Sequence, residues 1–143
     1  MRLSTRSRYA ARALGELVRQ GGENEPVMMR KLAERQNVSK RYLDNIFSTL
    51  RLAGLIRTTR GAAGGYMLNR AADQITVLDV VEALDGDLDL VECVDEGYDC
   101  SMKGDCACHV VWSEASNALR DALRKWDLRT LSGMTCQDCP KGS

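Results

Sequence analysis

Hydrophobic side chains recur at helical spacing in three successive stretches of the first fifty residues, separated by polar breaks. The first stretch follows two candidate N-caps, Ser4 and Thr5. Its apolar positions are Ala10, Ala13, Leu14, Leu17 and Val18. The second runs from about Met28 to Arg35, and Ser39 caps the third. The inner stripe of the third consists of Leu43, Ile46, Phe47 and Leu50. The pattern predicts three amphipathic helices.

The second and third of these helices have the spacing of a helix-turn-helix. Ala33 is small enough to let the two helices approach, and Asn37, at the turn, tolerates a left-handed backbone. Two short strands are predicted next, at residues 55–59 and 65–68, joined by the glycine-rich tip 60–64. A helix pair followed by such a hairpin predicts a winged helix-turn-helix in residues 1–70.

The second half of the chain predicts two more helices around a loop. Thr76 and Asp79 form a capping box for a short helix at 77–84. A long helix is expected from about Cys108 to Trp126, and the tail from Gly133 onward looks irregular. Trp112 and Trp126 are expected in the core or in a dimer interface. The fold class is therefore mainly α with a small β-wing.

Charge is divided unevenly along the chain, although the formal net charge is zero. Residues 1–70 carry 14 Lys and Arg against 5 Asp and Glu, whereas residues 71–143 carry 6 against 15. A net charge of +9 in the first half favours contact with a polyanion there; two solvated faces that attract each other are the alternative. No apolar run is long enough for a membrane span or a signal peptide, so we expect a cytoplasmic protein with reduced thiols.

The predicted recognition helix places several side chains where they would face the major groove. Arg41 suits guanine, Asn45 suits adenine and Asp44 suits the amino group of cytosine. Arg6 and Arg8 are candidate phosphate contacts, and Arg57 and Arg60 at the wing are candidates for clamping phosphate or entering a minor groove. The candidate DNA-binding residues are Arg6, Arg8, Ser39, Lys40, Arg41, Tyr42, Asp44, Asn45, Arg57, Arg60 and Gly64.

Seventeen residues hold four of the six cysteines and the only histidine. These residues are Cys93, Cys100, Cys106, Cys108 and His109. Thiolate and imidazole are ligands of soft and borderline metals. Zinc is disfavoured because the gaps of six and five residues are wide for zinc knuckles. Free thiols or a redox disulfide are the alternative, and the pair Cys136 and Cys139 in the tail remains unassigned.

Four segments, 1–10, 42–47, 56–66 and 75–86, resemble the bacterial winged-helix regulators typified by IscR, NsrR, RirA and CymR. The resemblance extends over about residues 1–131 and implies a homodimeric transcription regulator that reads palindromic double-stranded operator DNA. It divides the chain into a DNA-binding domain at 1–70, a short helix and sensor loop at 71–107, a dimerisation helix at 108–131 and a tail at 132–143.

The same resemblance implies a 2Fe–2S cluster held by Cys93, Cys100 and Cys106, as in the IscR, NsrR and RirA branch. His109 is the implied fourth ligand because it follows the last cysteine by three residues in a segment that ends in Trp. Cys108 is the alternative fourth ligand. Two departures from the IscR pattern are a first gap of six residues rather than five and the additional thiol of Cys108. An acidic ligand near the chain start, as in NsrR, is disfavoured because Arg8 stands there.

We therefore expect a DNA-binding regulator, acting as a repressor, that senses iron–sulfur, redox, iron or nitric oxide status. The alternative is a clusterless regulator of the same fold, like CymR, controlled by thiol oxidation or a protein partner. An enzyme with a small-molecule substrate is disfavoured because no nucleophile and base pattern is present and the chain has one histidine.

Overall fold

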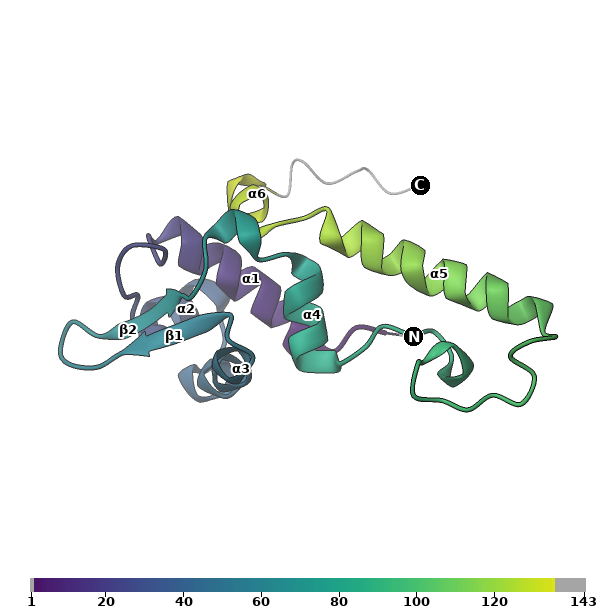
Figure 1. Cartoon of the computed structure of the whole chain (residues 1–143). Helices are drawn as coiled ribbons and strands as arrows, with labels where there is room; N and C mark the ends of the chain where they lie inside the picture. Colours follow the sequence, from purple (N-terminus) through teal and green to yellow (C-terminus); the bar gives the residue numbers. More distant parts are fainter. Residues whose placement is uncertain (1, 136–143) are drawn as a thin grey trace.

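The computed structural model describes residues 2–135 and shows six α-helices and a two-stranded wing in this range. The long helix projects away from the remaining elements (Figure 1). Two short 3-10 turns lie at Ala72–Gln74 and Glu92–Val94. The main elements are α1 (Thr5–Arg19), α2 (Met29–Gln36), α3 (Lys40–Leu52), β1 (Ile56–Thr59), β2 (Gly65–Leu68), α4 (Val77–Asp85), α5 (Ala107–Arg124) and α6 (Leu128–Gly133).

Local capping sets the starts of the helices in the first half, as the sequence predicts. Of the two candidate caps of α1 it is Ser4 that acts, because its hydroxyl accepts the Ser7 N–H at 3.1 Å. Ser39 caps α3 by accepting the N–H of Tyr42 at 3.1 Å. Asn37 ends α2 in the left-handed region, at φ 53° and ψ 47°. The mainly helical fold with a winged helix-turn-helix is confirmed.

One hydrophobic core joins α1, α2, α3 and the wing. The predicted apolar stripes of α1 and α3 are almost entirely buried in it, and Phe47 stacks edge-on against Tyr66 with ring centroids 5.1 Å apart. Burial of these stripes supplies most of the driving force for folding of the first half. We call this part of the molecule, together with α6, the head.

The wing is an antiparallel pair in which Ile56 lies opposite Leu68 and Thr59 lies opposite Gly65. Val27 extends the pair, because it exchanges two backbone hydrogen bonds of 2.9 Å with Tyr66. A Cβ added at Gly64 would lie 2.2 Å from the carbonyl oxygen of Thr59. The hairpin tip therefore requires glycine at this position.

The end of the long helix differs from the sequence prediction. The helix was expected to reach Trp126, within a unit ending at 131, but α5 ends at Arg124 and α6 is a separate helix capped by Asp127. Two long-range backbone hydrogen bonds stop the helix: Val77 N–H donates to Trp126 at 2.8 Å, and Leu128 N–H donates to Ile75 at 2.9 Å. They return the chain to the head, where Leu128 is fully buried.

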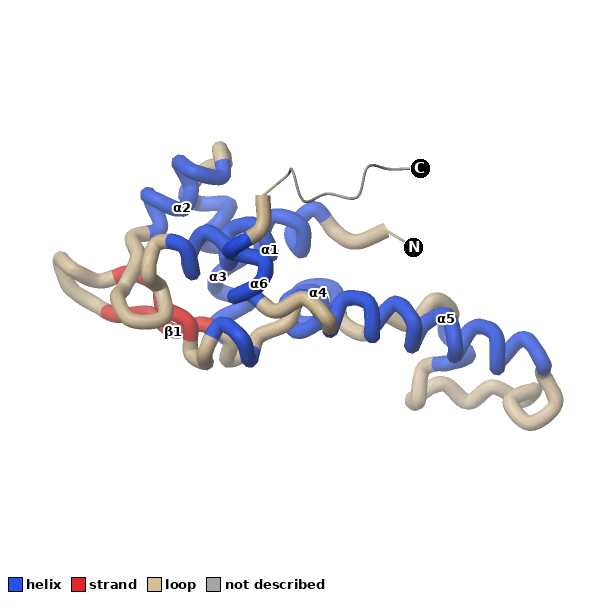
Figure 2. Tube along the Cα trace, turned by 90° about the horizontal axis from the view of Figure 1, so that it is seen from above, coloured by secondary structure: helices blue, strands red, loops and turns tan. Residues whose placement is uncertain are grey.

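A second, smaller cluster attaches α5 to α4. Buried Leu78, Val81 and Leu88 pack there with Leu119 and Leu123 of α5. The predicted capping box of α4 is confirmed, since Thr76 and Asp79 exchange side-chain and backbone hydrogen bonds. The N-terminal half of α5 runs beside residues 86–106, which we call the cysteine loop (Figure 2). No helix within residues 2–135 is long and apolar enough to cross a membrane.

Candidate functional site

The N-terminal half of α3 presents an exposed polar surface on the head. Lys40, Arg41 and Asn45 are exposed there, and Ser48 extends the surface by one turn. A shallow cavity of about 610 Å³ lies along this side of the helix. Ser39 is also exposed, but its hydroxyl is engaged as the N-cap, so it fixes the start of the helix. The geometry is that of a recognition helix whose first two turns are free to enter a groove.

Asp44 differs from its neighbours because both its carboxylate oxygens have partners within the protein. Lys40 donates to one oxygen at 2.6 Å, and the Tyr66 hydroxyl donates to the other at 3.3 Å. Burial, together with the Asp44 charge and this hydrogen bond, raises the pKa of Tyr66. Asp44 therefore links the recognition helix to the wing, a role that the sequence prediction of cytosine contact did not include.

The two wing arginines are exposed on the β1 side of the hairpin, Arg57 within β1 and Arg60 at the start of the tip. Tyr42 is half-buried, and its ring packs edge-on against Tyr9 with centroids 5.8 Å apart. Gly64 shapes the hairpin tip through its backbone, since a side chain there would clash with the Thr59 carbonyl oxygen. The wing thus carries its positive charge on side chains with open access to solvent, as a phosphate contact requires.

The two arginines of α1 that the sequence groups together have different environments. Arg8 is exposed, whereas Arg6 is half-buried and its Nη2 donates to Thr49 Oγ1 at 3.0 Å and to Asn45 Oδ1 at 3.5 Å. Both acceptors lie on α3, about forty residues away in sequence. Spacing along the chain carries no signal for such a contact.

The cysteine loop holds its predicted ligands on one continuous segment. Cys93 lies in the 3-10 turn Glu92–Val94, Cys106 is the N-cap residue of α5, and Cys108 and His109 follow in the first turn. All four cysteines of this segment are free thiols; Cys108 is exposed and the other three are half-buried. Cys136 and Cys139 lie outside the described residues.

The predicted ligands do not converge in this structure. Within residues 2–135, no three Cys, His, Asp or Glu side chains gather closely enough to hold a metal ion. The backbone of residues 94–106 makes mainly short-range hydrogen bonds, such as Lys103 N–H to Cys100 at 3.1 Å and Cys106 N–H to Met102 at 3.0 Å. Convergence of the thiols requires a local change in these turns.

The donor set nevertheless fits a soft metal centre. Free thiols supply the thiolates that iron–sulfur clusters require. Nδ1 of His109 is buried without a hydrogen-bond partner, which is costly for a ring nitrogen and leaves it available as a ligand. At helical spacing, His109 lies on the same side of α5 as Ser113 and Ser116, which face the loop, whereas Cys108 is exposed. This placement favours His109 over Cys108 as fourth ligand.

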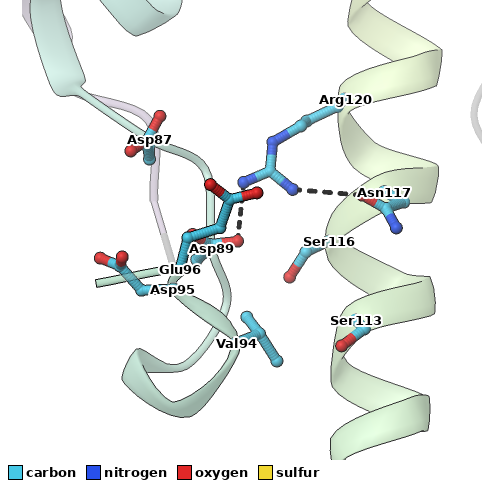
Figure 3. Close-up of a pocket in the computed structure, with 9 residues that line it drawn as sticks. All are labelled: Asp87, Asp89, Val94, Asp95, Glu96, Ser113, Ser116, Asn117 and Arg120. Atoms are coloured by element: carbon cyan, nitrogen blue, oxygen red, sulfur yellow. Dashed lines mark hydrogen bonds and ion pairs between the residues drawn. The ribbon is translucent and has the colours of Figure 1, made fainter. Parts of the chain in front are cut away.

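The root of the cysteine loop is attached to α5 by polar contacts (Figure 3). Arg120 donates to Asp89 at 2.7 Å, and the N–H of Leu90 donates to buried Ser116 at 3.1 Å. The hydrogen bond to Asp89 is the main reason that the pKa of Arg120 is raised. A cavity of about 530 Å³ separates the next part of the loop from α5. Asp89 and Arg120 look like ordinary surface charges in the sequence, so this attachment has no sequence signal.

A second side of α5 carries small and apolar side chains that no other part of residues 2–135 covers. Val111 and Trp126 are 54% and 44% exposed. Ala118 lies seven residues after Val111 and Ala122 four residues after Ala118, so both continue the same side of α5, and Trp126 follows four residues later, just past the end of the helix. Trp112 is 40% exposed, so neither tryptophan belongs to the core of the chain described here.

Comparison with known proteins agrees with this architecture. The model of the Rrf2 family, described as an iron-dependent transcriptional regulator, matches residues 3–133. A protein named rrf2 from Nitratidesulfovibrio vulgaris (strain Hildenborough) is 38% identical over 143 residues, which is all of this chain and 94% of the relative. IscR of Erwinia tasmaniensis, named as an HTH-type transcriptional regulator, is 37% identical over 92% of this chain and 78% of its own length.

Solved structures show the same fold. CymR of B. subtilis, described as the global cysteine regulator of that organism, superposes with a TM-score of 0.75 at 31% identity, covering 94% of this chain and 98% of that one. IscR of T. potens gives a TM-score of 0.71 at 29% identity, covering 99% and 94%. The similarity thus includes the long helix and the cysteine loop as well as the head.

Proposed function

The chain belongs to the Rrf2 family of transcriptional regulators, and from this premise we propose that it is a cytoplasmic, homodimeric repressor whose DNA binding is controlled by a 2Fe–2S cluster. The family consists of regulators rather than enzymes. One observation carries the proposal: a winged head with a net charge of +9 in residues 1–70 is joined through α4 to residues 93–109, which hold four of the six cysteines and the only histidine.

In this proposal the head reads operator DNA through α3 and the wing. Arg41 and Asn45 are exposed on the first two turns of α3 and contact base edges in the major groove. Arg8, Arg57 and Arg60 contact phosphates and fix the register of the head on the duplex. Asp44 holds the wing against α3 and so sets the spacing between the two contact surfaces.

A second copy of the chain covers the exposed side of α5. Val111, Ala118 and Ala122 form an apolar stripe at the spacing that paired helices bury against each other. The small alanines permit close approach, and Val111 and Trp126 lose their exposure in the pair. Two heads related by two-fold symmetry then meet the two halves of a palindromic site.

Cys93, Cys100, Cys106 and His109 hold the cluster in this proposal. A bound 2Fe–2S cluster supplies an oxidant-sensitive link between the loop and the start of α5. Three half-buried free thiols and the unpartnered Nδ1 of His109 support this ligand set. Asp89 and Ser116 keep the root of the loop on α5 while the ligands beyond it rearrange.

A clusterless regulator is the second candidate. Four free thiols that do not converge, together with a fold like that of CymR, favour control by thiol oxidation or by a protein partner. The two candidates share the head and its DNA contacts and differ in what the cysteine loop detects. Single cysteine substitutions, described in the Discussion, separate them.

Salt dependence of DNA binding tests the proposed use of the head. We expect the logarithm of the association constant to fall linearly with the logarithm of salt concentration, because phosphate contacts release counterions. Arg60→Ala is expected to weaken binding and to reduce the slope by about 1. Fluorescence anisotropy with a labelled duplex at several salt concentrations measures both quantities.

Arg124→Ala is the matched control for this measurement. It removes the same charge from an exposed side chain at the end of α5, where the only partner of its guanidinium that the structure gives is Asp121. Its slope should equal that of the wild type. A wild-type affinity that does not change with salt would contradict the proposed contact with phosphates.

A further inference from the structure

We propose that Arg6 is a positioning residue for base recognition, because it orients the side-chain amide of Asn45. Asp85, at the root of the cysteine loop, holds in position the start of α1, which carries Arg6. The proposal rests on the proposed function, because it assigns a specificity role within the same DNA-binding surface. It also connects the cysteine loop to the recognition helix through contacts within one chain.

The guanidinium of Arg6 bridges α1 and α3. It donates to Thr49 Oγ1 at 3.0 Å and to Asn45 Oδ1 at 3.5 Å, while its Nε is buried without a hydrogen-bond partner. Arg8, two residues later on the same helix, is exposed. The Arg6 charge is therefore held against the recognition helix, unlike that of Arg8, which extends into solvent.

Orientation of the Asn45 amide decides what this residue reads. Asparagine reads adenine when its carbonyl oxygen accepts from N6 and its amino group donates to N7. A guanidinium can only donate, so the Arg6 contact at 3.5 Å favours the orientation that presents the Asn45 amide oxygen to it, and this oxygen retains a second lone pair for the base. A side chain held in the reading orientation before binding loses less freedom on the DNA.

Asp85 connects this contact to the cysteine loop. It is the last residue of α4, and Gly86 follows with φ +79° at the start of the loop. Its Oδ2 accepts the N–H of Ser4, the N-cap of α1, at 3.0 Å. Burial raises the pKa of Asp85, but hydrogen bonds from Ser4 and Ser7 and the nearby Arg6 charge lower it overall.

The contacts form a short chain from Asp85 to Ser4, then along the first turn of α1 to Arg6, and across to Asn45. Because Asp85 accepts from Ser4 at the start of α1, a rearrangement of the loop that displaces Asp85 also moves the guanidinium of Arg6. The consequence is a change in base preference at the position that Asn45 reads, in addition to any change in overall affinity. Coupling of this kind requires two arrangements of one element that the loop favours unequally.

The test uses the full-length protein and a duplex that the wild type selects from a random-sequence library. Affinities are measured for this duplex and for a set carrying each single base-pair change. We expect Arg6→Ala to reduce the wild-type preference at one A·T position, by less than the about 5- to 150-fold that loss of the whole bidentate pair costs. Asn45→Ala should abolish the same preference, and the double variant should lose nothing more at that position.

Arg8→Ala is the charge-matched control and should weaken binding equally across all duplexes. Thr49→Val keeps the Arg6 charge and the helix but removes the 3.0 Å hydrogen bond, so it should shift the same preference with a smaller effect. Asp85→Ala removes the acceptor of the Ser4 N–H and should shift the same preference, whereas Asp87→Ala, which removes an exposed carboxylate two residues on, should not. Thermal melting of each variant verifies that the head is folded.

Two results separate the possible failures. If Arg6→Ala keeps the wild-type preference, or lowers all affinities equally as Arg8→Ala does, the positioning role of Arg6 is wrong and the proposed function stands. If the wild type selects no sequence from the library, the proposed function fails and the inference fails with it.

Discussion

Serine at position 93, 100 or 106 is expected to abolish iron retention after anaerobic reconstitution, with the same outcome for each single variant. A serine hydroxyl has nearly the size of the thiol but does not ionise near neutral pH, so each substitution removes one thiolate ligand. Cys93→Ser, Cys100→Ser and Cys106→Ser should each yield protein without the visible absorbance of a cluster. Iron and sulfide per chain, measured with the absorbance spectrum, provide the comparison.

Cys108→Ser is the matched control, since Cys108 is the exposed thiol of the same segment. It should retain iron and sulfide at the wild-type level, whereas His109→Ala should lose them or bind them weakly. Loss of iron in Cys108→Ser with retention in His109→Ala would mean that Cys108, and not His109, is the fourth ligand. A regulatory effect confined to one or two cysteines, with no iron in the wild type, would favour the thiol-switch candidate.

Alanine at position 64 is the second substitution with a large expected effect. Its Cβ would lie 2.2 Å from the Thr59 carbonyl oxygen and 2.9 Å from that of Gly61, so the backbone of the hairpin tip must move. Overpacking of this kind costs about 1–3 kcal/mol of folding free energy. Displacement of Arg57 and Arg60 should also remove about two phosphate contacts and lower the salt slope of DNA binding by about 2.

Gly133→Ala provides the control for this substitution, because no heavy atom would lie within 4 Å of its added Cβ and it lies outside the cysteine loop. Urea unfolding and the anisotropy titration should both give wild-type values for it. Wild-type affinity and slope in Gly64→Ala would mean that the wing does not contact the duplex.

Sequence predicted the head well because its signals are local. The caps Ser4 and Ser39, the left-handed turn at Asn37 and the apolar stripes of α1 and α3 act over a few residues. The capping box of α4 belongs to the same class. Each of these features can be recognised from residue type and spacing alone.

Features set by long-range contacts could not be predicted in the same way. The break between α5 and α6 depends on backbone hydrogen bonds from residues 75–77, about fifty positions earlier. From the sequence, Arg6 is a candidate phosphate contact, whereas in the fold its guanidinium donates to Thr49, which is 43 residues away along the chain. Spacing along the cysteine loop gives the donor set, whereas the positions of the thiols depend on how the turns between them fold.

The affinity of one wild-type sample for one operator duplex, measured anaerobically before and after iron is removed, tests the central claim most directly. Coupling between two sites on a protein is typically worth about 1–3 kcal/mol. We therefore expect the Kd of the reconstituted protein and that of the iron-free protein to differ by about 5- to 150-fold. Equal Kd values for the two forms would contradict control of the head by the cysteine loop.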